Sequence, residues 1–276
     1  MNGLDLRALF SLDGKIALVT GGSRGIGYMI SQGLLQAGAR VYITARDADA
    51  CRGAAGELGR IGPCEAMPID ISDAGARREL AEILSGREGK LDILVNNAGT
   101  SWGDRYEDYA AEAFDKVFRL NVASVFAMTR DFTPLLERAA SKEEPSRVIN
   151  IGSIDGLHVP TVHRLGTYAY AASKAAVHHL TRQLAVELGP RSITVNAIAP
   201  GFFRSRMTDY FFERFADDLK GNSLLGRVGE TADIAGTAIY LCSRAGAYTH
   251  GAVIPVDGGT AINHQHARTV DTDQGA

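Results

Sequence analysis

The stretch TGGSRGIG at residues 20–27 lies between the apolar run KIALVT (15–20) and the helical pattern YMISQGLLQAG (28–38). A glycine-rich turn between a strand and a helix lets backbone amides approach a pyrophosphate at the positive helix end, because glycine has no Cβ in the way. The spacing is TGxxxGxG rather than GxGxxG, but strand, turn and helix follow one another in the required order. The sequence therefore predicts a dinucleotide site, with contacts from Gly21, Ser23, Arg24, Gly25, Ile26 and Gly27.

Short apolar runs alternate with longer segments of helical period along the rest of the chain. Their unbroken apolar character is typical of parallel strands that are covered on both faces, and the helical segments are long enough for right-handed crossovers. The runs are KIALVT (15–20), VYITA (41–45), LDILVNNAG (91–99), RVINIGS (147–153), ITVNAIAPG (193–201) and AVIPVDGG (252–259). We therefore expect an α/β fold, a single-domain Rossmann-type doubly wound parallel sheet with helices on both faces.

The composition is that of an ordinary globular protein with a small-molecule partner. Of 276 residues, 45% are hydrophobic and 22% are charged, and a formal net charge of −3 gives no sign of a nucleic-acid or membrane partner. Neither a signal peptide nor a membrane-spanning stretch is recognisable, which favours a cytoplasmic protein. Three cysteines without metal-type spacing predict neither a disulfide framework nor a metal site. We expect a leader at 1–12, the Rossmann-fold domain at 13–262 and a polar, frayed tail at 263–276.

The residues after the second predicted strand select the dinucleotide. NAD enzymes generally place an acid on the ribose 2′-hydroxyl there, whereas NADP enzymes place a cation on the 2′-phosphate. Arg46 stands at this position, and Arg24 in the glycine turn offers a second guanidinium whose planar donors suit phosphate oxygens. The sequence thus favours NADP(H). Asp47 keeps NAD(H) open as the alternative, because a strand that ends one residue later would bring its carboxylate to the ribose.

Tyr170 and Lys174 form a candidate proton-transfer pair. Reduction of a ketone needs hydride on carbon and a proton on oxygen, and a free tyrosine with a pKa near 10 exchanges protons poorly at neutral pH. The two residues are four apart in a segment of helical pattern, so both project from one face, where the ammonium can lower the pKa of the phenol. Tyr168 is not the partner of a lysine, because its fourth successor is Ala172.

Several motifs stand in one consistent order: TGGSRGIG, NNAG (96–99), Asn121, Ser153, the YxxxK of Tyr170 and Lys174, and Pro200-Gly201. Together they resemble the classical short-chain dehydrogenase/reductase family over about residues 13–260. More narrowly, ARDA (45–48), NNAGTSWG (96–103) and RVINIGS (147–153) resemble 3-oxoacyl-[acyl-carrier-protein] reductases of the rhamnolipid-associated β-ketoacyl reductase type.

This resemblance implies roles for the remaining motif residues. Lys174 would also bind the nicotinamide ribose, Ser153 would polarise the carbonyl oxygen, and Asn121 would help to hold a proton-relay water. Asn96 is interpreted mainly as a strand-end cap, and the family implies a homotetramer. Further cofactor contacts are implied at Asp70, Ile71, Asn97, Ala98, Gly99, Tyr170, Lys174, Pro200, Gly201, Phe203 and Ser205, the last in place of the family's common threonine.

The predicted activity is NADPH-dependent reduction of a ketone to a secondary alcohol, with a 3-oxoacyl thioester of acyl carrier protein or CoA as the favoured substrate. A broader NADP(H) dehydrogenase of ketones, steroids or sugars would use the same residues and stays open. A non-catalytic NADP-binding sensor or scaffold is disfavoured, because the serine, tyrosine and lysine are all present. Arg138 and Arg191 are candidate contacts for an acidic carrier protein or a CoA phosphate, although single surface arginines are usually only solvated.

Two segments are expected to determine the substrate. Ser153 precedes Tyr170 by 17 residues, more than is usual in the family, which predicts an enlarged loop at 154–167 beside the substrate mouth. In this loop, His158 and His163 either contact substrate or, as we favour, pack or face solvent. The second segment follows Gly201, and its aromatic residues fit a lid over an acyl chain and a subunit interface equally well: Tyr210, Phe211, Phe212 and Phe215.

Overall fold

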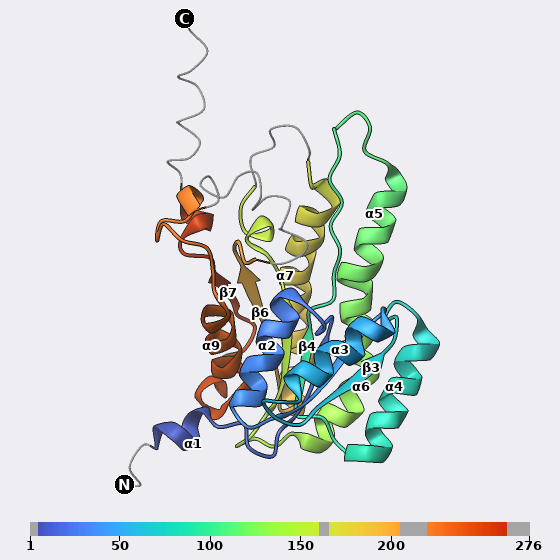
Figure 1. Cartoon of the computed structure of the whole chain (residues 1–276), viewed down its shortest axis with the longest axis vertical. Coiled ribbons are helices and arrows are strands. Elements are labelled where there is room, and N and C mark those ends of the chain that lie inside the picture. Colours follow the sequence, from blue (N-terminus) through green and yellow to red (C-terminus); the bar gives the residue numbers. More distant parts are fainter. Residues whose placement is uncertain (1–4, 160–165, 205–219, 264–276) are drawn as a thin grey trace, which may run out of the picture.

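The fold is a seven-stranded sheet in the order β3-β2-β1-β4-β5-β6-β7, seen in a computed structural model that describes residues 5–159, 166–204 and 220–263 (Figure 1). Every pair of neighbouring strands is parallel. The chain builds one half outward from β1, then returns to begin the other half at β4, so the strand order reverses between these two strands. The strands are β1 (Ile16–Thr20), β2 (Arg40–Ala45), β3 (Cys64–Pro68), β4 (Ile93–Asn96), β5 (Ser146–Ile151), β6 (Ile193–Pro200) and β7 (Val253–Val256).

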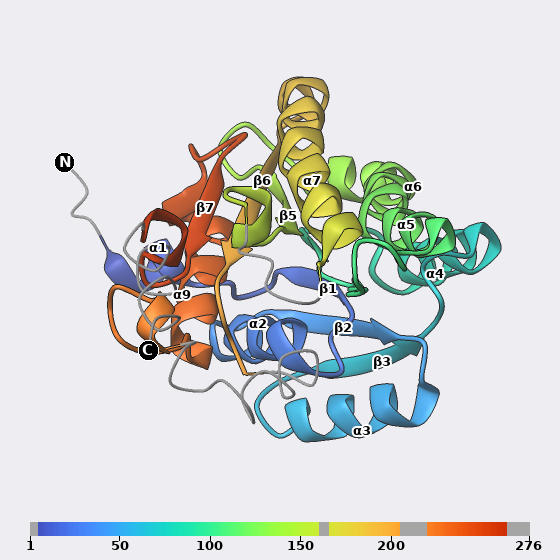
Figure 2. The ribbon, with the colours of Figure 1, turned by 90° about the horizontal axis from the view of Figure 1, so that it is seen from above.

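Helices cover both faces of the sheet, which confirms the doubly wound fold (Figure 2). One hydrophobic cluster joins the strands to α2, α3 and α9, and a second joins them to α4, α6 and α7. Successive residues of β1 alternate between the clusters, with Ala17 and Val19 in the first and Ile16 and Leu18 in the second. The helices are α1 (Leu6–Phe10), α2 (Gly25–Gln36), α3 (Ala48–Leu58), α4 (Ala74–Glu88), α5 (Ala111–Phe118), α6 (Ser124–Ala139), α7 (Tyr168–Leu188) and α9 (Thr231–Cys242).

The predicted strands differ from the structure mainly at their ends. The runs at 91–99 and 147–153 leave the sheet at Asn96 and Ile151, so the residues after them form loops at its carboxyl edge. No apolar run marks β3, because this edge strand buries only Met67 fully. The last residue of the predicted leader, Leu12, packs in the core of the domain, since its side chain is fully buried in the first cluster.

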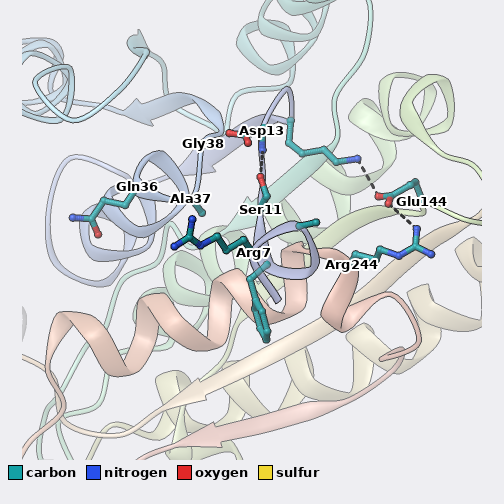
Figure 3. A pocket seen from close by; sticks show the side chains of 11 residues that line it. Arg7, Ser11, Asp13, Gln36, Ala37, Gly38, Glu144 and Arg244 are labelled. Carbon is teal, nitrogen blue, oxygen red and sulfur yellow. Dashed lines mark hydrogen bonds and ion pairs between the residues drawn. The ribbon is translucent and has the colours of Figure 1, made fainter. Parts of the chain in front are cut away.

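A groove of about 850 Å³ lies beside α1, at the amino ends of the strands (Figure 3). Lys15, directly before β1, lies 3.3 Å from the Glu144 carboxylate, and Arg244 reaches the same carboxylate at 3.4 Å. The motifs that are predicted to be catalytic lie at the opposite edge of the sheet, so this groove is separate from them. None of the described helices is long and apolar enough to cross a membrane, and no group of three possible metal ligands occurs within the described ranges.

Candidate active site

The glycine turn after β1 has the geometry of a phosphate-binding loop. Gly21 and Gly25 have φ angles of +66° and +56°, a region that side chains with a Cβ rarely enter. A Cβ on Gly27 would lie 2.4 Å from both the Asn97 side-chain nitrogen and the Gly21 carbonyl oxygen. Arg24, the residue before α2, makes no side-chain capping bond, so it leaves the first amides of the helix to a ligand. These features fit a pyrophosphate.

Thr20 and Asn97 brace this turn against the end of β4. The Thr20 hydroxyl oxygen accepts hydrogen bonds from the backbone nitrogens of Asn97 at 2.9 Å and Ala98 at 3.0 Å. The Asn97 side chain donates to the carbonyl oxygens of Thr20 at 2.9 Å and Gly21 at 3.1 Å. Sequence reasoning did not anticipate the role of Thr20; its place as the last residue of β1 was the available signal. The Asn97 side chain is thus committed to the turn.

The structure at the end of β2 indicates which residue, Arg46 or Asp47, is available to the cofactor ribose. The strand ends at Ala45, and the Asp47 carboxylate accepts hydrogen bonds from the backbone nitrogens of Asp49 at 3.1 Å and Ala50 at 3.0 Å. Asp47 is therefore the N-cap of α3, whereas Arg46 is exposed. The arrangement fits a 2′-phosphate better than a free 2′-hydroxyl.

The turn after β3, where adenine contacts are expected, is held by a buried ion pair. The Asp70 carboxylate accepts from the backbone nitrogen and hydroxyl of Ser72 at 2.9 and 2.7 Å. Arg77 on α4 donates to the Ile71 carbonyl oxygen at 2.7 Å and to the Asp131 carboxylate at 2.9 Å. Sequence reasoning missed this ion pair because Arg77 lies on α4 and Asp131 lies on α6, so no local spacing connects them.

The four predicted catalytic residues come from three elements at the carboxyl edge of the sheet. Ser153 begins the short 3-10 turn Ile154–Gly156 after β5, and Tyr170 and Lys174 lie on α7. The Lys174 ammonium donates to the Ile151 carbonyl oxygen at 2.7 Å and lies 5.6 Å from the centre of the Tyr170 ring. Tyr170 also forms a hydrogen bond with Ser153. Serine, tyrosine and lysine therefore form one group.

Asn121 lies in a π-helical turn, Arg119–Ala123, between α5 and α6. Its side-chain nitrogen donates to the Thr100 carbonyl oxygen and to the Ser173 hydroxyl, both at 2.9 Å, and its oxygen accepts from the Thr100 backbone nitrogen at 2.8 Å. A π-turn interrupts the regular helix and is frequent at functional sites. Asn121 thus joins the loop after β4 to α7, beside Lys174.

Burial controls the protonation of the pair. It lowers the pKa of Lys174 from 10.5 to about 8, while the Asp155 carboxylate acts in the opposite direction. It also raises the pKa of Tyr170 to about 12, with a further contribution from Asp155, and the hydrogen bond with Ser153 opposes the rise. The expected lowering of the tyrosine pKa by lysine is therefore not found. Tyr170 keeps its proton at neutral pH.

Several other predicted residues have structural partners. The Asn96 side chain, interpreted as a cap, donates to Thr129 at 3.1 Å and Asn150 at 2.9 Å inside the sheet. The Phe203 ring is buried against Gly229, so it packs inside the protein. Tyr168 packs its ring 5.2 Å from that of Tyr109, away from the pair. Outside the described residues lie Ser205, His163, Tyr210, Phe211, Phe212 and Phe215.

Comparisons with known proteins identify the family of the chain. The family model described as Enoyl-(Acyl carrier protein) reductase matches residues 21–261. A rhamnolipids biosynthesis 3-oxoacyl-[acyl-carrier-protein] reductase of Pseudomonas aeruginosa is 52% identical over 256 residues, 91% of this chain and 97% of its own. A gluconate 5-dehydrogenase of Gluconobacter oxydans is 33% identical over 92% of this chain and 98% of its own. The solved structure of an RhlG/NADP active-site complex from Pseudomonas aeruginosa matches with a TM-score of 0.88 and 50% identity, covering 92% of this chain and 99% of that one. The chain belongs to the short-chain dehydrogenase/reductase family.

Proposed function

We propose that this protein uses NADPH to reduce the ketone of a 3-oxoacyl thioester to the 3-hydroxyacyl form. The observation that carries the proposal is the group of Ser153, Tyr170 and Lys174 at the carboxyl edge of the sheet, where the phosphate-binding turn also lies. The 52% identical relative, which is named as a 3-oxoacyl-[acyl-carrier-protein] reductase, supports the substrate class. The 33% identical gluconate 5-dehydrogenase keeps a polyol or sugar ketone as the second candidate.

When bound, NADPH supplies the hydride that the carbonyl carbon receives. Tyr170 holds its proton through neutral pH, so it can donate this proton as negative charge develops on the substrate oxygen. The Ser153 hydroxyl, which already bonds to Tyr170, is placed to bind the same oxygen. The positive charge of Lys174 stabilises the phenolate that remains on Tyr170 after the transfer. Each group thus acts at the oxygen side of the reaction.

Exchange of Arg46 for Asp is expected to move the cofactor preference toward NADH. A charge-assisted phosphate contact is lost and a carboxylate is placed beside the 2′-phosphate, so the NADPH/NADH ratio of kcat/KM should fall by about 10- to 100-fold. Arg60→Asp is the matched control, because Arg60 is also exposed but lies after α3, toward the amino ends of the strands. Unchanged selectivity in Arg46→Asp would show that another residue recognises the phosphate.

A steady-state screen tests the substrate class. Purified protein is assayed with NADPH and NADH against acetoacetyl-CoA, longer 3-oxoacyl thioesters, crotonyl-CoA, diketones, steroids and a 5-keto sugar acid. The proposal predicts the highest kcat/KM for NADPH with 3-oxoacyl thioesters. Turnover of free ketones beside inactive thioesters would favour the broader dehydrogenase, and turnover of crotonyl-CoA alone would indicate enoyl reduction.

We further propose that the protein is a cytoplasmic homotetramer and that its thioester is carried by acyl carrier protein. Phe126 on α6 and Val186 on α7 are 45% and 80% exposed, which supports assembly through these helices. Light scattering is expected to give four times the 29.4 kDa chain mass, and a stable monomer would contradict the assembly.

Arg191 pairs with Glu187 and Glu137, and Arg138 donates to Ser85. These arginines are therefore weaker candidates for docking a carrier protein than the sequence suggests.

A further inference from the structure

Asp155 is an acidic side chain beside the catalytic group that none of the assigned roles uses. It lies two residues after Ser153, in the 3-10 turn Ile154–Gly156, and its backbone nitrogen donates to the Ser153 hydroxyl oxygen at 3.2 Å. This turn packs directly on α7, since a Cβ on Gly156 would lie 2.7 Å from the backbone of both Lys174 and Ala175. The close approach brings Asp155 to the face of α7 that carries Tyr170 and Lys174.

Asp155 is the acidic group whose charge favours the ammonium form of Lys174. Burial raises the pKa of Asp155 itself, and the charges of His158 and Lys174 oppose that rise. From the turn and the residues that follow it, Asp155 and His158 face this region, and from α7 the titratable groups are Tyr170, Lys174, His178 and Arg182. Within the described part of the chain, Asp155 is the carboxylate that acts on both Tyr170 and Lys174.

The two histidines nearby serve the turn. Burial lowers the pKa of His178 to about 4, so this imidazole is neutral and bonds through Nδ1 to the Gly156 carbonyl oxygen at 3.3 Å. The Nδ1 atom of His158 lies 2.9 Å from the Ile154 carbonyl oxygen. These hydrogen bonds fix the turn that carries Asp155. Neither histidine provides a negative charge for Lys174.

We propose that Asp155 is a positioning residue of the reaction, whose carboxylate keeps the Lys174 ammonium charged and the Tyr170 proton in place. The activity in question is the proposed ketone reduction. Burial alone drives the ammonium toward the neutral amine, and a nearby carboxylate opposes this change. The same carboxylate disfavours a phenolate on Tyr170. Both effects extend the proton-donating state of the site to higher pH.

The Asp155→Asn variant tests this proposal, because it removes the charge and nearly preserves the shape. Without the carboxylate, the pKa values of Lys174 and Tyr170 both fall, and both groups act in their protonated forms. The basic limb of the kcat profile for ketone reduction is therefore expected to move by about 1 pH unit to lower pH. Asp155→Glu should restore part of the shift. Asp5→Asn, which changes the cap of α1 near the amino ends of the strands, should leave the profile unchanged.

A second measurement does not depend on turnover. An NMR titration of the Lys174 side-chain nitrogen, assigned with Lys174→Met, should give a lower midpoint in Asp155→Asn than in the parent protein. A kcat that falls equally at every pH, together with an unmoved NMR midpoint, would overturn the proposal. If the parent protein reduced no ketone while the midpoint still moved, the proposed function would fail and only the effect of Asp155 on the charge of Lys174 would stand.

Discussion

Replacement of Tyr170 by Phe is expected to lower kcat for ketone reduction by about 10³- to 10⁴-fold, because the phenol is the proton donor to the substrate oxygen. The ring keeps its place on α7 and loses only the hydroxyl that bonds to Ser153. NADPH affinity should change little, since the phosphate turn and Arg46 are untouched. Steady-state assays give kcat, and a fluorescence titration gives the Kd for NADPH.

Tyr168→Phe is the matched control for this variant. Tyr168 lies on the same helix, but its ring packs against Tyr106 and Tyr109 instead of the catalytic group. We expect this control to retain nearly the parent kcat. Comparable losses in both variants would indicate a general disturbance of α7 and would contradict proton donation by Tyr170.

Replacement of Lys174 by Met is expected to have opposite effects on activity and stability. Loss of the ammonium should lower kcat by about 10²-fold or more. The free energy of unfolding at pH 7 should nevertheless rise by about 1 to 2 kcal/mol. Burial lowers the pKa of Lys174 from 10.5 to about 8, which reduces the free energy of unfolding by about 3 kcal/mol at neutral pH. The methionine variant removes this penalty but also loses the hydrogen bond to Ile151, which contributes about 1 kcal/mol to stability.

The sign of this stability effect follows from proton binding. Between pH 8 and 10.5 the unfolded chain binds the Lys174 proton more tightly than the folded protein, so the stability of the parent protein rises with pH across this range. The gain in the free energy of unfolding from Lys174→Met should therefore be largest at pH 7 and smaller at pH 10. Urea unfolding of both proteins at the two pH values measures this difference. Lys142→Met, at an exposed position, should change neither activity nor stability, and a destabilised Lys174→Met would refute the account of the buried ammonium.

The layered sheet was predictable because buried parallel strands must be apolar on both faces. Residues such as Ile16, Ala17, Leu18 and Val19 alternate between two hydrophobic clusters, and only a sheet covered by helices on both sides satisfies that pattern. The edge strand β3 was not marked in the same way, because an edge position tolerates Glu65 and partly buried neighbours. The carboxyl ends of β4 and β5 also escaped prediction, since they depend on contacts such as that of Thr20 with Asn97.

The group of Ser153, Tyr170 and Lys174 was predictable because helical spacing places Tyr170 and Lys174 on one face, and the family resemblance adds Ser153 after β5. What the sequence could not give is the balance of electrostatic effects. An ammonium four residues from a phenol suggests a lowered tyrosine pKa, yet burial and Asp155 raise the pKa of Tyr170 to about 12. The carboxylate of Asp155 joins the site through the packing of a 3-10 turn on α7. Such long-range packing leaves no periodic signal in the sequence.

The transfer of deuterium from 4-deuterated NADPH to a 3-oxoacyl thioester tests the central claim most directly. Single-turnover samples of the parent protein and of Tyr170→Phe are quenched, and mass spectrometry measures the label in the product. We predict a 3-hydroxyacyl product with deuterium at C3 from the parent protein and at least about 10³-fold slower labelling from Tyr170→Phe. Absence of label in the parent reaction, or equal rates in the two proteins, would contradict the account.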